Sequence, residues 1–69
     1  MQLGTQEEID NQYVVLNQAE DALVMATLRL RALKGEGLMQ SGDSFPVRSI
    51  TAATDALIKE FGSRNLRTF

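Results

Sequence analysis

Acidic side chains are the first candidates for chemistry in this chain, which contains neither His nor Cys. Glu20 and Asp21 could in principle form the carboxylate pair of a general acid and base. They are adjacent in sequence, however, and adjacent side chains diverge on a helix, so we expect a solvated face instead. Asp10 has no His or Cys to share a metal with, and Asp43 lies in a Gly/Ser segment that resembles no calcium loop. The sequence therefore predicts no catalytic residue, no metal site and no enzyme.

A short glycine-rich stretch, GEG at residues 35–37, weakly resembles phosphate-binding loops. Such loops follow a strand and carry a further Gly or a Lys at fixed spacing. Here the stretch follows a predicted helix and lacks those residues. We interpret Gly35 as a helix stop and expect no cofactor.

Three basic residues, Arg29, Arg31 and Lys34, are the candidates for contact with nucleic acid. They occupy different sides of the predicted helix, and each suits the negative end of the helix dipole. The net charge is −2, and no aromatic residues alternate with the basic ones. Nucleic-acid binding is therefore not expected. A small regulator that binds nucleic acid as a dimeric four-helix bundle stays as the alternative function.

Charge is distributed unevenly along the chain. Residues 1–28 carry five acidic and no basic side chains, whereas residues 29–69 carry all seven basic side chains and four acidic ones. The first residues lack the basic and apolar regions of a secretory signal. The longest apolar run, residues 22–26, is far shorter than the roughly 20 residues that cross a bilayer. We expect no membrane insertion and a cytoplasmic setting, or a place in an intracellular assembly.

A long helix is predicted over residues 6–34, after a lead-in at 1–5. The sequence TQEE, Thr5–Glu8, fits a capping box. In this motif the Thr5 hydroxyl accepts a hydrogen bond from the Glu8 N–H, and the Glu8 carboxylate accepts one from the Thr5 N–H. No Gly or Pro interrupts the chain until Gly35. Such a helix would be roughly 43 Å long.

A second, shorter helix is predicted over residues 46–61. The Gly/Ser-rich residues 35–45 form a loop, Pro46 suits a first helical turn, and Gly62 ends the helix before a tail at 62–69. Ser49 is an alternative N-cap. The whole chain, residues 1–69, is then one all-α domain, an antiparallel two-helix hairpin.

Apolar residues recur every three or four positions on both helices. In the second helix they form a stripe consisting of Val47, Ile50, Thr54, Leu57 and Phe61. In the long helix, a heptad repeat with Ile9 at position a places apolar residues at seven of its eight a and d positions. We call these eight residues the heptad seam: Ile9, Gln12, Leu16, Ala19, Leu23, Ala26, Leu30 and Leu33. The simplest hairpin packs the seam against the stripe.

The long helix has apolar residues on a second face as well, formed by Val24, Met25 and Leu28. At 100° per residue these side chains lie opposite the seam, beyond the reach of the second helix. Within one chain, the loop could cover them through Leu38 and Met39. We favour instead a second copy or another helical protein as the cover.

The two helices also differ in length, about 24 Å against about 43 Å. The first turns of the long helix, with Ile9, Tyr13 and Leu16, then have no helical neighbour in the chain. We predict that the tail docks beside them through Leu66 and Phe69, on its own chain or on a neighbouring copy. The predicted partner interface is therefore Ile9, Tyr13, Leu16, Val24, Met25, Leu28, Leu66 and Phe69.

A chain of 69 residues forms only a thin core, and small proteins usually add disulfides, a metal or association. Because this chain has no Cys or His, association is the remaining way to stabilise so small a core. The sequence predicts a non-enzymatic helical protein–protein interaction module, which associates with itself or with another helical protein into a larger bundle or coiled coil. It would be an oligomerising adaptor or a structural subunit of a virion, a filament or a secretion apparatus. A chaperone or antitoxin that covers a specific protein partner is a further alternative.

Overall fold

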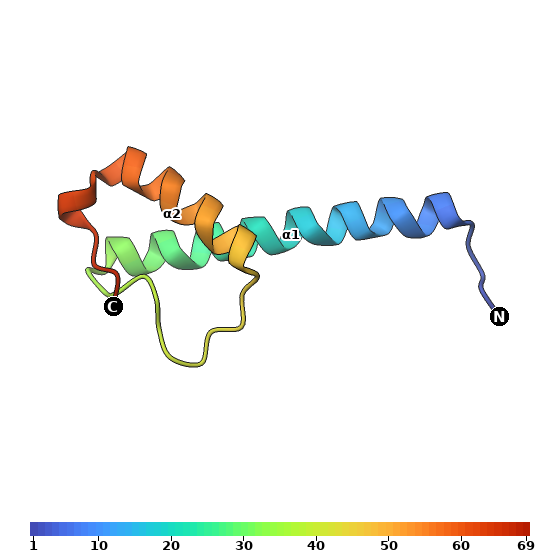
Figure 1. Cartoon of the computed structure of the whole chain (residues 1–69), viewed down its shortest axis with the longest axis horizontal. Helices are drawn as coiled ribbons and strands as arrows, with labels where there is room; N and C mark the ends of the chain where they lie inside the picture. The colour runs from blue at the N-terminus through green and yellow to red at the C-terminus, as the bar shows by residue number, and fades with distance from the viewer.

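The protein is all-helical, with two helices that pack against each other (Figure 1). A computed structural model describes residues 1–69. Helix α1 comprises Gln6–Leu33, helix α2 comprises Val47–Phe61, and a single turn of 3₁₀ helix, η1, comprises Ser63–Asn65. The predicted all-α two-helix fold is confirmed, and both predicted helices agree with the structure to within one residue at each end.

Helix α1 begins at the predicted capping box. The Thr5 hydroxyl accepts a hydrogen bond from the Glu8 N–H (3.1 Å), and the Glu8 carboxylate accepts one from the Thr5 N–H (2.9 Å). The bond from the Thr5 backbone is the main reason that the pKa of Glu8 lies below its ordinary value. This local pairing explains why the helix starts here, because it satisfies N–H groups that have no partner inside the helix.

The other end of α1 is closed by a Schellman motif. Gly35 has φ 74°, a left-handed conformation that costs glycine little. Its N–H donates to the Ala32 carbonyl (3.1 Å), and the Glu36 N–H donates to the Arg31 carbonyl (2.9 Å). These are the two hydrogen bonds that define the motif. The interpretation of Gly35 as a helix stop is confirmed.

The two helices run in the same direction, not in opposite directions. Asp21 of α1 pairs with Arg48 at the start of α2 (3.0 Å), and Arg29, further along α1, pairs with Glu60 at the end of α2 (2.8 Å). An antiparallel hairpin would reverse this order, so that part of the prediction is wrong. Residues 34–46 return along the molecule (Figure 1), and at about 3.3 Å per residue they can span about 43 Å, well beyond the roughly 22 Å of α2. A connection of this length allows either direction.

The core lies between α2, the loop and one face of α1. Its buried apolar residues are Val24, Leu28, Leu38, Ala53 and Leu57, and Ser49 is the one buried polar residue. Only 6 of the 69 residues are buried, so the single chain has a thin core, as predicted from its length. Ser49 is the third residue of α2, which begins at Val47. The alternative helix start at Ser49 is therefore wrong.

The face of α1 that enters the core is the second face, not the heptad seam. Leu28 is fully buried, whereas Leu23 of the seam is 59% exposed. The buried Leu38 shows that the loop covers the second face within the chain. Most of the predicted stripe of α2 does face the core, because Leu57 is buried and Ile50 and Phe61 pack against the core. Val47 is the exception and is exposed, whereas Ser49 and Ala53 are buried.

The tail lies at the opposite end of α1 from the predicted site. The Leu38 N–H donates to the Arg67 carbonyl (2.8 Å), and the Met39 N–H donates to the Thr68 carbonyl (2.7 Å). Leu66 packs against the core. Because α2 runs parallel to α1, the tail emerges near the end of α1 and cannot reach Ile9. The predicted docking beside the first turns of α1 is wrong for this reason.

The molecule is elongated, with a head and a stalk. Its principal extents are 51 × 25 × 16 Å, and its radius of gyration is 15.3 Å, against about 11 Å for a compact chain of this length. The stalk is residues 6–16 of α1, which project from the head (Figure 1), whereas Asn17 already accepts a hydrogen bond from Arg48 of α2 (3.1 Å). The head contains the remainder of α1, the loop, α2 and the tail. The prediction that the first turns of α1 lack a helical neighbour within the chain is confirmed.

Candidate helix interface

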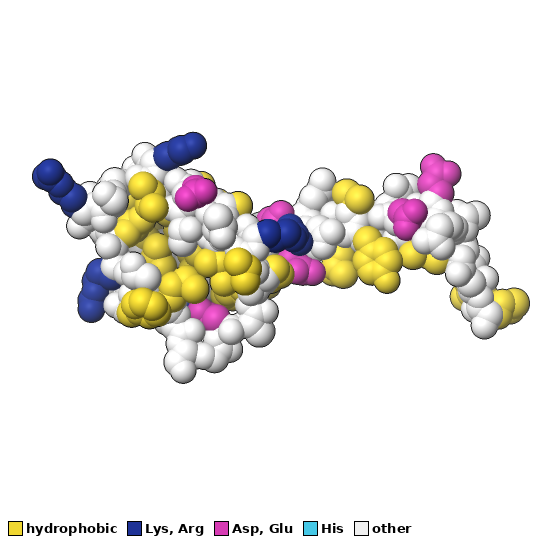
Figure 2. Space-filling view, viewed as in Figure 1, with side chains coloured by type: hydrophobic (Ala, Val, Ile, Leu, Met, Phe, Trp, Pro, Cys, Tyr) yellow, Lys and Arg dark blue, Asp and Glu magenta, His cyan; other side chains and the backbone are white.

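The heptad seam is the most extensive apolar surface that the chain leaves uncovered. Leu30 is 58% exposed and Leu33 is 66% exposed, although both belong to the half of α1 that lies in the head. In the stalk, Leu16 is exposed and Ile9 is half-buried. Every seam residue is exposed or half-buried. The seam is therefore open along the whole length of α1, and Figure 2 shows apolar side chains extending along the stalk.

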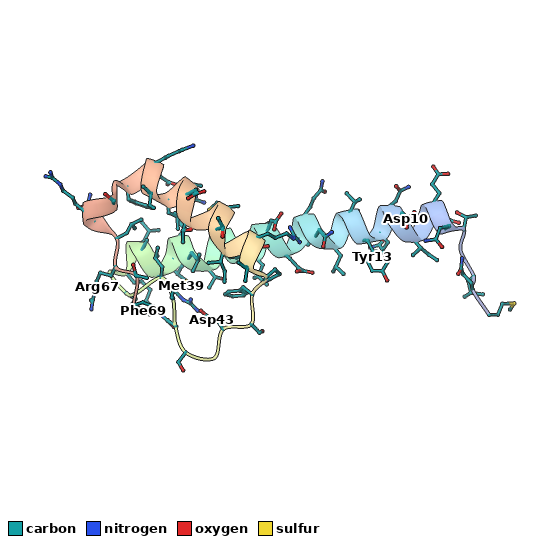
Figure 3. The ribbon with its side chains drawn as sticks, viewed as in Figure 1. Asp10, Tyr13, Met39, Asp43, Arg67 and Phe69 are labelled. Carbon is teal, nitrogen blue, oxygen red and sulfur yellow. The ribbon has the colours of Figure 1, made fainter.

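A shallow groove marks the stalk end of the seam. It is lined by Ile9, Gln12, Tyr13 and Leu16, whose side chains follow one another at spacings of three and four on one side of the helix. Figure 3 shows Tyr13 on the stalk, away from the head. The structure thus brings together three of the predicted interface residues on one apolar surface.

The other predicted interface residues lie elsewhere. Val24 and Leu28 are buried in the core and are therefore not available to a partner. Met25 and Leu66 pack against the core half-buried, and their assignment to a partner interface stays a prediction. Phe69 is exposed, but at the far end of the molecule from the stalk (Figure 3). The corrections have two causes: Val24 and Leu28 were misassigned because the predicted hairpin placed α2 on the seam, and the tail residues were misplaced because α2 runs parallel to α1.

Three seam residues of the head, Leu23, Leu30 and Leu33, were not predicted to be available to a partner. Their signal was present in the heptad repeat, which marks an apolar face without indicating which helix covers it. Because the predicted hairpin packed α2 on that face, these three leucines were expected to be buried within the chain.

The loop is fixed to α1 by a bidentate ion pair. Arg31 donates from Nη1 to Asp43 Oδ2 (2.8 Å) and from Nη2 to Asp43 Oδ1 (2.9 Å), and its Nη1 also donates to the Leu38 carbonyl (2.8 Å). These hydrogen bonds lower the pKa of the Asp43 carboxyl and raise the pKa of Arg31. Both side chains are mostly buried. Arg31 and Asp43 therefore hold the loop over the core, which also places Leu38 in it.

Polar pairs also fix α2 against the second face. Asp21 accepts hydrogen bonds from Arg48 and from the buried Ser49 hydroxyl, and Arg29 pairs with Glu60. Glu20, next to Asp21 in sequence, makes no hydrogen bond or ion pair, which agrees with the prediction that the two carboxylates diverge. In heptad terms the second face occupies positions b, c and f, opposite the a and d positions of the seam.

Three further findings concern metal ligands, the membrane and known proteins. No three acidic side chains lie close enough together to hold a metal ion. Neither helix has both the length and the apolar character needed to cross a bilayer. Comparisons with protein-family models, with curated proteins and with solved structures find no match.

Proposed function

We propose that this chain is a non-enzymatic protein–protein interaction module that self-associates through the heptad seam, as an adaptor or as a subunit of a larger assembly. One observation carries the proposal. The seam, with seven apolar residues at eight a and d positions, is uncovered from Ile9 to Leu33. Sustained a and d repeats of this kind are typical of helices that pack against a further helix.

The energetics of the single chain support association. Large apolar side chains contribute about 1.5–3 kcal/mol each when fully buried. The seam holds five such residues, namely Ile9, Leu16, Leu23, Leu30 and Leu33, and the four leucines are each more than half exposed. Their burial in an interface would add a driving force comparable with the few kcal/mol that a core of this size supplies.

Sedimentation velocity or light scattering over a concentration series tests the proposal. We expect the parent chain to exceed its monomer mass of 7.6 kDa at micromolar concentrations. Leu23→Glu places a charge on the seam, and burial of an unpaired charge in an interface is costly. This variant should stay monomeric and keep its helical circular dichroism, because Leu23 has no part in the core.

A matched control is available on the same helix. Gln18→Glu makes the same charge change at an exposed position outside the seam and should leave the mass of the assembly unchanged. A parent chain that is a folded monomer at high micromolar concentration would contradict the proposal. Equal loss of mass in both variants would show that net charge, not the seam, controls association.

A further inference from the structure

We infer that the seam is covered by the seam of a second copy of this chain, packed antiparallel. This inference rests on the proposed self-association and specifies the partner and its direction.

The exposed area of the single chain is sufficient for such a pair. The chain exposes 5263 Å², whereas a compact protein of its mass exposes about 4,300 Å². The excess, about 1,000 Å², exceeds the roughly 800 Å² that each partner contributes to a standard interface. The exposed leucines of the seam lie on α1, so an α1–α1 pair is an arrangement that covers them.

Side-chain size along the seam favours the antiparallel direction. The antiparallel alignment that stacks all eight seam positions puts Ile9 opposite Leu33 of the second copy, Leu16 opposite Ala26, and Leu23 opposite Ala19. Each Ala then faces a Leu. A parallel, in-register pair instead puts Ala19 against Ala19 and Ala26 against Ala26. Large residues opposite small ones fill the space between helices evenly, whereas layers of Ala on Ala leave it underfilled.

The groove on the stalk has a matching occupant in this alignment. Leu33 and Leu30 of the second copy lie opposite Ile9 and Gln12, which line the groove. Leu33 and Leu30 are both more than half exposed in the single chain. The head does not obstruct the approach, because α2 and the loop pack on the opposite face of α1.

Charge favours the same direction. Residues 1–28 carry five acidic and no basic side chains, and residues 29–69 carry an excess of three basic ones. Figure 2 shows basic side chains on the head and not along the stalk, whereas acidic ones lie on both. An antiparallel pair separates the two acidic stalks and places each beside the head of the other copy, which carries seven basic and six acidic side chains; its one like-charge contact at the e positions is Glu20 with Glu20. A parallel pair places acidic stalk on acidic stalk, and its e and g positions bring Arg29 beside Lys34 of the other copy.

Spin labels on this cysteine-free chain test the direction. Three single-cysteine variants are labelled with a nitroxide: Gln6→Cys and Lys34→Cys at the two ends of α1, and Gln18→Cys near its middle. Double electron–electron resonance then measures distances between copies. In the antiparallel pair, equivalent ends lie about 40 Å apart. Labelled Gln6→Cys alone and Lys34→Cys alone should therefore each give a long distance, and an equal mixture of the two should add a distance below about 20 Å.

The central label separates the inference from the proposed function. Gln18 lies near the middle of the alignment, so in a pair of either direction Gln18→Cys gives a distance well below the roughly 40 Å between equivalent ends, although its c position faces away from the partner. A short distance for Gln18→Cys together with a short distance for Gln6→Cys alone would overturn the antiparallel inference and leave self-association intact. Absence of dipolar coupling in all samples, with a monomer mass, would overturn both.

Discussion

Leu28 and Leu30 are two residues apart on α1 and differ completely in environment. Leu28 packs in the core with Val24 and Leu57, whereas Leu30 lies on the seam and is 58% exposed. The two residues have the same side chain on the same helix. Their substitutions therefore separate the stability of the single chain from the strength of its association.

We expect Leu28→Ala to lower the free energy of unfolding by about 2–5 kcal/mol, a loss that a core of six buried residues can hardly tolerate. The loss should be the same at every protein concentration. Leu30→Ala, the matched control, should reduce only the part of the stability that rises with concentration. Urea titrations at several concentrations measure both effects. Similar, concentration-independent losses in the two variants would show that the seam is not an interface.

Gly37 is the residue at which the tail approaches the loop most closely. A Cβ atom built on Gly37 would overlap the backbone of Phe69 and lie 2.7 Å from its Cα. These are backbone atoms, which cannot turn aside as a flexible side chain can. The absence of a side chain at this residue is therefore what allows the tail to pair with Leu38 and Met39.

We predict that Gly37→Ala displaces the tail and costs about 1–3 kcal/mol, the value of two backbone hydrogen bonds. Hydrogen exchange should accelerate at the amides of Leu38 and Met39, which donate to the tail. Gly4→Ala is the control, because its Cβ would meet only ordinary contacts. Unchanged exchange at Leu38 and Met39 would show that the loop holds its position without the tail.

At the scale of elements, the loop determines how the two helices meet. It carries the chain back along α1, delivers Leu38 to the core and is held by the Arg31–Asp43 pair. Long connections are usually mobile, with few buried residues. Here a mostly buried ion pair and a buried Leu make the loop part of the packed structure, and this explains how a parallel pair of helices can form in such a short chain.

The Arg31–Asp43 pair predicts a loss of stability in acid. Since the pKa of Asp43 is lowered in the folded state, the ionised carboxylate stabilises the fold above the unfolded pKa of about 3.9. This contribution is lost as the pH falls through the lower, folded value. Asp43→Asn should lower the melting temperature at pH 7 by several degrees. Between about pH 5 and pH 2 the melting temperature of this variant should fall less than that of the parent.

Asp55→Asn is the matched control for this experiment, because Asp55 is exposed and forms no ion pair. It removes the same charge and should leave both the melting temperature and its acid dependence close to those of the parent. If Asp43→Asn behaves like Asp55→Asn, the loop does not depend on this pair.

At the scale of the whole molecule, an antiparallel pair has a twofold axis near the middle of α1. Glu20 occupies an e position, and in the alignment above the two Glu20 side chains of a pair face each other across this axis. In a parallel pair, Glu20 would face Val15 of the other copy instead. Glu20 has no partner of its own in the single chain, so its charge is free to repel its counterpart.

Glu20→Gln should therefore tighten self-association. Relief of one like-charge contact is a change of a few tenths of a kcal/mol to about 1 kcal/mol, or about a two- to five-fold lower dissociation constant. Glu7→Gln, which removes the same charge from an f position outside the seam, should have a smaller effect. Sedimentation equilibrium measures both constants, and equal effects of the two variants would contradict a twofold axis at Glu20.

The two helices and their ends follow from short-range features of the sequence. The capping box at Thr5, the stop at Gly35 and the stop at Gly62 act through hydrogen bonds between residues three to five apart. Such contacts are present in the local sequence whatever the rest of the chain does. The apolar seam was evident for the same reason, because its period is a property of one helix.

Only the tertiary structure decided which face of α1 is covered and in which direction α2 runs. Both faces of α1 are apolar, and residues 34–46 are long enough for either direction, so helical periodicity could not distinguish the alternatives. The selection depends on pairings between distant residues, Arg48 with Asp21 and Arg31 with Asp43. Their energies exist only when the chain is folded, since each requires two side chains from different elements to meet. Together with the packing of Val24 and Leu28 against Leu57, these pairings hold α2 on the second face, and the seam stays free.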